Sequence, residues 1–138
     1  MKIDGGCHCG AVRYEAEVDP RNTVVCHCTD CQVISGTAFR TVVLAPADRF
    51  ALLTGELKTY VKTADSGARR AQCFCPECGT HIYATSVGDA PRTLNLRVGT
   101  CSQRDELRPS RQIWCRSALG WLDELGSVER IEKGRPAN

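Results

Sequence analysis

Alternation of apolar and polar residues is clearest near the N-terminus, where Val12, Tyr14, Ala16 and Val18 are separated by charged side chains. A period of two places the apolar residues on one face of a β-strand and the charged residues on the other. Turn sequences such as Asp19-Pro20-Arg21-Asn22 separate this stretch from further β-rich segments. The pattern predicts short strands over residues 12–18, 23–28, 37–44, 57–63, 71–75, 80–85 and 93–99.

Helical periodicity is confined to a late segment of the chain. Ser117 suits a helix N-cap, Leu119, Leu122 and Leu125 follow at helical spacing, and Gly126 suits the end of the helix. The long crossover helices that parallel strands require are missing from the pattern. We therefore predict a mainly β, antiparallel domain with short helical segments near the C-terminus.

Length and composition favour one domain over residues 1–131 of the 138-residue chain. The polar end, residues 132–138, carries Gly134 and Pro136 and is expected to be a disordered tail. The N-terminus lacks the apolar region of a signal peptide, and no apolar run approaches the roughly 18 residues of a membrane span. The expectation is a soluble, cytoplasmic protein.

Charge and cysteine content narrow the chemistry. The net charge is +2, with Lys and Arg scattered along the chain, so neither nucleic acid nor a membrane is an expected partner. The ten cysteines are far more than an ordinary chain of this length carries. In a reducing compartment, such a number indicates metal or thiol chemistry rather than disulfides.

Four of the cysteines make a complete ligand set for zinc. In an extended strand, Cys7 and Cys9 point to the same side. Cys75 and Cys78 form a Cys-x-x-Cys turn followed by Gly79, in which both sulfurs can converge on one ion. The two pairs together predict a four-cysteine structural zinc site, Cys7, Cys9, Cys75 and Cys78.

The middle cluster, Cys26, Cys28 and Cys31, supplies three thiols with no obvious fourth ligand. A zinc ion with three protein ligands keeps a position for water or substrate, which is typical of catalytic sites. These three residues are therefore the candidate active site. His27 should point away from its neighbours' sulfurs in an extended segment, so we interpret it as a supporting or pocket residue.

The other cysteines have less distinctive settings. Cys101 and Cys115 stand alone and are interpreted as small buried hydrophobic residues. Cys73 has three possible interpretations: a spare ligand beside Cys75, a fourth ligand for the middle cluster, or a residue packed in the core. The spacing from Cys28 to Cys31 also occurs in redox proteins, but no βαβ pattern surrounds it, so a thioredoxin-like role ranks last.

The combined motifs resemble the glutathione-dependent formaldehyde-activating enzyme (GFA) family. The resemblance covers residues 5–122 and rests on GGCHCGAVRYE, CHCTDC, CFCPECGTHIY and QIWCRSALGWL. It implies an Mss4-like β-tent fold with two zinc ions. By motif, Cys7, Cys9, Cys75 and Cys78 would hold the structural ion, and Cys26, Cys28 and Cys31 a catalytic ion that is the more labile of the two.

The family's founding activity is the condensation of formaldehyde with glutathione to S-hydroxymethylglutathione, a carbon–sulfur lyase reaction read in reverse. The resemblance thus implies a zinc-dependent lyase-like enzyme whose partner is a small thiol such as glutathione or its aldehyde adduct. Arginine side chains are the expected partners of the carboxylates of such a substrate, because they form paired hydrogen bonds with carboxylates. The candidates are Arg13, Arg40, Arg69, Arg70 and Arg97, although a solvated strand face is the more usual place for each of them. Phe39 and Phe74 lie beside predicted strands and could line a pocket, but core packing is the more usual role of such side chains.

The alternative function is a non-catalytic binding module in which both zinc ions are structural. Recruitment of Cys73 as a fourth ligand of the middle cluster would favour it. The sequence makes no prediction of the oligomeric state, the physiological substrate or the direction of the reaction.

Overall fold

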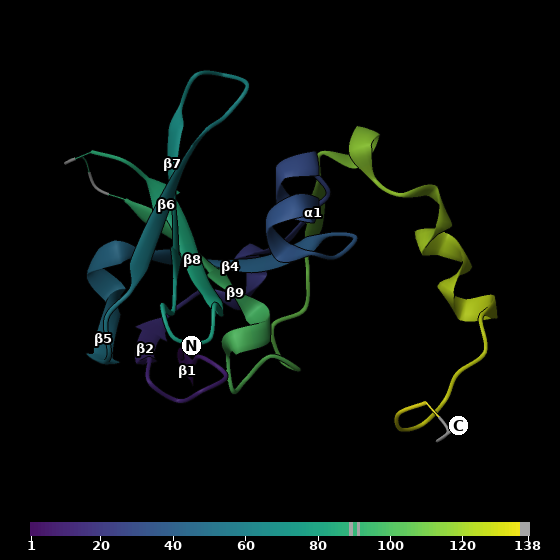
Figure 1. Ribbon diagram of the computed structural model, residues 1–138, viewed down its shortest axis with the longest axis horizontal. Helices are drawn as coiled ribbons and strands as arrows, with labels where there is room; N and C mark the ends of the chain where they lie inside the picture. The colour runs from purple at the N-terminus through teal and green to yellow at the C-terminus, as the bar shows by residue number, and fades with distance from the viewer. Residues whose placement is uncertain (89, 91, 136–138) are drawn as a thin grey trace.

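Ten strands form two sheets in the computed structural model, which describes residues 1–88, 90 and 92–135 (Figure 1). The smaller sheet is antiparallel and has the order β1 (Lys2–Gly6), β2 (Arg13–Glu17) and β5 (Phe50–Thr54). The larger sheet has the order β10 (Arg111–Ile113), β3 (Thr23–Cys26), β4 (Arg40–Pro46), β9 (Thr93–Arg97), β8 (His81–Ser86), β7 (Arg69–Phe74) and β6 (Lys58–Thr63). The prediction of a mainly β fold is confirmed.

One pairing departs from the antiparallel prediction. Strand β10 runs parallel to β3, and this register sets Ile113 beside Cys26. Parallel neighbours need a long connection, and here most of the larger sheet lies between the two strands along the chain. Strands β1, β5 and β10 were not predicted, because none of them shows a β-rich alternating pattern of useful length.

The short helical segments predicted near the C-terminus are present, but they are 3₁₀, and one α-helix was not predicted. The only α-helix among the described residues is α1 (Thr29–Ser35), which follows β3 directly where the sequence predicted strand to residue 28. The segment expected to form a helix from Ser117 is instead 3₁₀, with η4 (Cys115–Ser117) and η5 (Gly120–Ser127). The remaining 3₁₀ turns are η1 (Pro20–Asn22), η2 (Ala47–Arg49) and η3 (Val98–Thr100).

The C-terminal segment, residues 115–135, extends away from the sheets and is called the arm below; it is drawn in yellow-green in Figure 1. Trp121 and Leu125 are exposed along it, so the leucine spacing does not reflect burial against the sheets. Of the tail predicted from residue 132, residues 136–138 lie outside the described residues. None of the helices in the described chain is long and apolar enough to span a membrane.

The core lies between the two sheets. Ile3, Tyr14 and Ala16 of the small sheet pack in one buried cluster with Val43 and Leu96 of the large sheet. On β2 the charged residues Arg13, Glu15 and Glu17 face outward between them, as the period of two requires. One face of the large sheet therefore packs on this core, and the other face is left free to form a site.

We predict that Leu96→Ala lowers the free energy of unfolding by about 2–5 kcal/mol, because truncation leaves a cavity where neighbours cannot fully collapse. Leu96 is completely buried in the core cluster. Urea unfolding of the metal-loaded protein measures the change. The matched control is Leu53→Ala, since Leu53 is 52% exposed. Equal losses in the two variants would contradict this account of the core.

Candidate metal centres and the adjoining cavity

The first cysteine set is built from two loops that belong to different sheets. Cys7 and Cys9 lie in the loop between β1 and β2, and Cys75 and Cys78 in the loop between β7 and β8. The extended strand expected for Cys7-His8-Cys9 is wrong, because β1 ends at Gly6 and the chain turns there. The turn nevertheless brings the two sulfurs within 3.5 Å of each other.

The two loops have closely similar backbone hydrogen bonds. The Cys7 amide donates to the Val12 carbonyl at 3.0 Å, and the Cys75 amide donates to the Thr80 carbonyl at 2.9 Å. Gly10 and Gly79 follow the two cysteine pairs with φ of 85° and 78°. This left-handed backbone is accessible to glycine at little steric cost. Each loop can therefore fold back and hold its two sulfurs on one side.

The four sulfurs fit a tetrahedral zinc ion. All four lie within 4.8 Å of one another, and Cys9 Sγ is 3.8 Å from Cys75 Sγ. A tetrahedron with zinc–sulfur bonds of ~2.3 Å has sulfur–sulfur edges of ~3.8 Å. Four thiols with this spacing are a donor set that zinc prefers.

The set is half buried and half exposed. Cys7 and Cys75 are buried, whereas Cys9 and Cys78 reach solvent. Thr80 joins the two loops, because its hydroxyl accepts a hydrogen bond from the His8 amide at 3.1 Å and lies 3.2 Å from Cys78 Sγ. That contact with Thr80 lowers the pKa of Cys78 to about 5 and so favours its thiolate.

The second set, Cys26, Cys28 and Cys31, is assembled where β3 meets α1. Cys26 is the last residue of β3, Cys28 caps α1, and Cys31 lies in the first turn of the helix. The Cys28 sulfur accepts a hydrogen bond from the Cys31 amide at 3.2 Å. The three sulfurs lie within 4.8 Å of one another, so the structure brings all three predicted residues together.

A hydrogen bond joins two thiols of the second set. Cys31 Sγ donates to Cys26 Sγ at 3.3 Å, which lowers the pKa of Cys26 to about 5 and raises that of Cys31. Within the described chain, no fourth His, Cys, Asp or Glu joins the group. The donor set fits a soft divalent ion such as zinc and leaves one tetrahedral position open.

The cysteines outside both sets have distinct environments. Cys73 belongs to neither set, and its sulfur lies 3.6 Å from the Thr59 hydroxyl. It pairs with Tyr83, which packs on the core, so Cys73 is on the core side of β7. Cys101 is buried as predicted, with its sulfur 3.2 Å from the Tyr14 hydroxyl. The prediction that Cys115 is buried is wrong, because it lies on the exposed arm.

His27 supports the second set without joining it. Its ring is buried, Nε2 lies 2.7 Å from Gln112 Oε1, and the edge of the ring meets Phe39 at 5.7 Å between centroids. Gln32 of α1 donates from Nε2 to the His27 carbonyl at 2.9 Å and to the Ser117 carbonyl at 3.0 Å. These bonds fix α1 against the start of the arm.

A cavity of about 510 Å³ adjoins the second set, within the range of small-molecule sites. Cys26 and Cys31 line one part of it, and its floor is the face of the large sheet turned away from the core. Its apolar lining includes Val42 and Leu44, and every strand of the sheet contributes at least one residue. Its cationic lining consists of Arg40, Lys62, Arg70, Arg97 and Arg111.

Two of these cations are buried beside each other. Arg40 and Arg97 are 7% and 8% exposed, and both donate to Gln72 Oε1, at 3.1 and 2.9 Å. Burial, together with the charge of Arg40, lowers the pKa of Arg97 to about 9. The amide oxygen carries no charge, so these contacts leave both guanidinium charges uncompensated.

The other residues proposed from the sequence to bind substrate are more scattered. Arg70 lines the cavity, whereas Arg69 is exposed beside it on β7 and Arg13 lies on the small sheet, 3.8 Å from Asp4. Phe74 stacks on His81 with ring centroids 5.2 Å apart. Sequence reasoning missed Gln72, Lys62 and Arg111, and the only signal for Gln72 was its spacing of two from Arg70.

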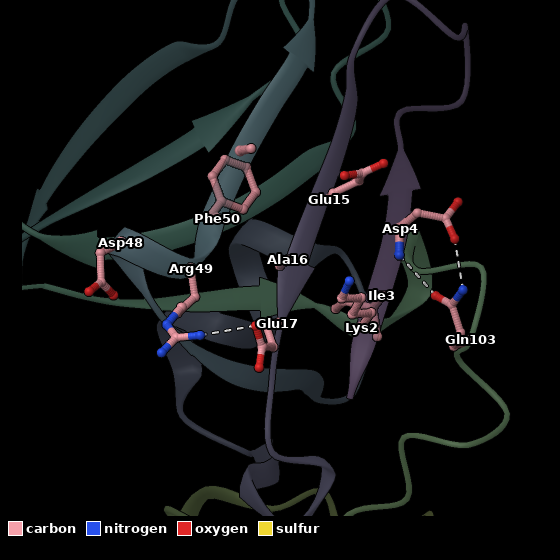
Figure 2. Close-up of a pocket in the computed structure, with 11 residues that line it drawn as sticks. Lys2, Ile3, Asp4, Glu15, Ala16, Glu17, Asp48, Arg49, Phe50 and Gln103 are labelled. Atoms are coloured by element: carbon pink, nitrogen blue, oxygen red, sulfur yellow. Dashed lines mark hydrogen bonds and ion pairs between the residues drawn. The ribbon is translucent and has the colours of Figure 1, made fainter.

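A separate hollow of about 650 Å³ lies on the solvent face of the small sheet (Figure 2). Arg49 and Glu17 are paired there at 3.0 Å, and the Asp4 carboxylate accepts a hydrogen bond from Gln103 at 2.7 Å. Neither cysteine set lines this hollow. The candidate chemistry is therefore on the opposite side of the core, at the large sheet.

Comparison with known proteins agrees with the cysteine pattern. Residues 2–117 match the family described as glutathione-dependent formaldehyde-activating enzyme. The chain therefore belongs to the GFA family. The family assignment and the β fold of the sequence analysis are confirmed.

Two relatives illustrate the extent of the similarity. A Penicillium rubens protein, whose name places it among the glutathione-dependent formaldehyde-activating enzymes, is 28% identical over 87 residues. The match covers 62% of this chain but only 44% of that relative. A crystal structure of a Rhodobacter sphaeroides protein superposes with a TM-score of 0.60 at 22% identity, covering 81% of this chain and 99% of that one. This second likeness concerns the fold alone.

We predict that Cys75→Ser removes one zinc ion per chain and lowers the free energy of unfolding by several kcal/mol, because a hydroxyl replaces a buried thiolate ligand. Elemental analysis of gently prepared protein and urea unfolding measure the two effects. Cys115→Ser is the matched control, since Cys115 is exposed and outside both sets. Full zinc content in Cys75→Ser would contradict the assignment of this set.

Proposed function

We propose that the protein is a zinc-dependent carbon–sulfur lyase-like enzyme acting on a small thiol adduct, as in the reaction of glutathione and formaldehyde to S-hydroxymethylglutathione. The observation that carries the proposal is the convergence of Cys26, Cys28 and Cys31 beside a 510 Å³ cavity, with no fourth donor among the described residues. Membership of the GFA family supports the same chemistry.

The two cysteine sets take different roles in this proposal. Cys7, Cys9, Cys75 and Cys78 hold a structural ion, because they complete a tetrahedron. Cys26, Cys28 and Cys31 hold the catalytic ion. When bound there, zinc supplies an exchangeable position at which the pKa of an incoming thiol is lowered.

The reaction requires no oxidant or reductant. A carbon–sulfur bond forms as the carbonyl π bond of the aldehyde breaks, and the proton of the thiol ends on the new hydroxyl. The chain's own contribution is to position the thiol and exclude water. Val42 and Leu44 give the cavity an apolar floor, while Arg40 and Arg97 attract the developing thiolate.

A thiol-rich site of this kind works best where thiols stay reduced, so we place the activity in the cytoplasm. The competing function is a binding module with two structural ions. Its strongest support from the sequence was Cys73 as a fourth ligand, and Cys73 instead lies on the core side of β7. Two four-sulfur zinc shells in X-ray absorption would favour the module, whereas one four-sulfur and one three-sulfur shell would favour the enzyme.

We predict that Cys28→Ser leaves the fold intact and abolishes the thiol-dependent turnover of formaldehyde. A serine hydroxyl can still accept the hydrogen bond from the Cys31 amide that caps α1, but it is a poor zinc ligand. Exchange NMR measures the rate of adduct formation above the spontaneous reaction, and circular dichroism measures the fold.

Cys73→Ser is the matched control, because Cys73 is a cysteine of β7 that lies outside both sets. It should retain turnover. Full activity in Cys28→Ser, or no rate above background in the wild type over a panel of thiols and aldehydes, would overturn the proposed function.

A further inference from the structure

The cavity beside Cys26 and Cys31 contains buried positive charge that no carboxylate among the described residues neutralises. Arg40 and Arg97 share one neutral acceptor, Gln72 Oε1, and Arg97 also donates to the Asn95 carbonyl at 3.2 Å. Arg40 Nε is buried with no hydrogen-bond partner among the described residues. Burying two like charges side by side is costly unless an anion compensates them. An anion bound at this pair would supply that compensation.

The surroundings add to the positive charge. Arg70 and Arg111 also line the cavity, and Lys62 does so while its ammonium contacts Asp30 at 2.7 Å. No Asp or Glu occurs among the described lining residues. The same holds for the described lining of the neighbouring hollow of about 620 Å³, which Arg40 and Arg97 also line.

Ionisation of the second cysteine set does not remove this excess. Three thiolates around a divalent ion carry a single net negative charge, whereas Arg40, Arg70, Arg97 and Arg111 supply several positive charges with no carboxylate partner among the described lining residues. Within a cavity of low polarity, electrostatic attraction to an anionic guest is strong. These guanidinium groups would repel an ammonium group on the bound ligand, and no carboxylate among the described lining residues could pair with it.

We propose that the thiol bound in this cavity is a compact polyanion that carries two carboxylates and no ammonium group, with one carboxylate on the Arg40–Arg97 pair. Planar guanidinium groups match carboxylates with two parallel hydrogen bonds. Arg40 is the cross-strand partner of Cys26, so the anionic end and the sulfur of the guest need be only a few bonds apart. The anion site rests on the cavity itself, and its role as a substrate site rests on the proposed function.

Binding of a probe that cannot ligate as a thiolate tests the anion site alone. The probe is 2-(methylthio)succinate, titrated by calorimetry into the zinc-loaded protein. We expect Arg97→Gln to weaken its binding by about tenfold or more, since hydrogen bonds to a charged group are lost. Arg69→Gln, which changes an exposed arginine on β7 outside the cavity, should bind the probe as the wild type does.

The stability of the variants separates binding from a structural role. Because Arg97→Gln removes one of two adjacent buried charges, its melting temperature without ligand should equal or exceed that of the wild type, while the rise caused by the probe should shrink. A loss of stability in Arg97→Gln together with unchanged probe affinity would show that the arginine is structural and would overturn the inference.

Turnover with formaldehyde tests the thiol class. Mercaptosuccinate should have a kcat/KM well above that of cysteamine, and Arg97→Gln should raise the KM for mercaptosuccinate by a much larger factor than the KM for 2-mercaptoethanol. Equal kcat/KM values for thiols of different charge would overturn this inference and leave the proposed function standing. Probe binding that depends on Arg97, with no turnover of any thiol, would overturn the proposed function and leave the anion site standing.

Discussion

The contact between the β1–β2 loop and the β7–β8 loop joins the two sheets at the first cysteine set. Cys7 and Cys9 belong to the small sheet's hairpin, and Cys75 and Cys78 to a hairpin of the large sheet. Structural zinc contributes about 10–16 kcal/mol to the folding of small zinc peptides. The whole stability of a typical domain is about 5–15 kcal/mol. An ion bound at this position would therefore contribute enough free energy to decide whether the two sheets stay packed. The cavity depends on that packing, because its floor is the other face of the large sheet.

The sequence predicted the two cysteine sets better than it predicted the local structure that forms them. Spacing and ligand chemistry are local properties, so Cys75-x-x-Cys78 with Gly79 could be interpreted directly. The strand expected at Cys7-His8-Cys9 is a turn, yet the sulfurs converge because a tight turn also brings neighbouring side chains together. Helix α1 was missed because none of its residues is buried and its cap is Cys28 rather than Ser, Thr, Asp or Asn.

The charged part of the site depends on strand order and register, which a single sequence does not reveal. Arg40, Arg70 and Arg97 were candidates by position, but their meeting requires β4, β9 and β7 to take particular places in one sheet. Gln72, which holds Arg40 and Arg97 together, carries no local signal of that role. The leucine spacing after Ser117 did indicate a helical segment, but η5 is 3₁₀ rather than α and its Leu125 is exposed. Most of the stability of a helix comes from packing its apolar face, and this segment has little surface to pack against.

The uneven burial of the first cysteine set has a consequence for its durability. Cys9 and Cys78 reach solvent, whereas Cys7 and Cys75 do not. In the proposed zinc site, peroxides and chelators would therefore encounter the outer pair first, and oxidation would begin on thiolates that reductants can also reach. The shielded inner pair would keep its place and could bind the ion again once the outer thiolates were restored.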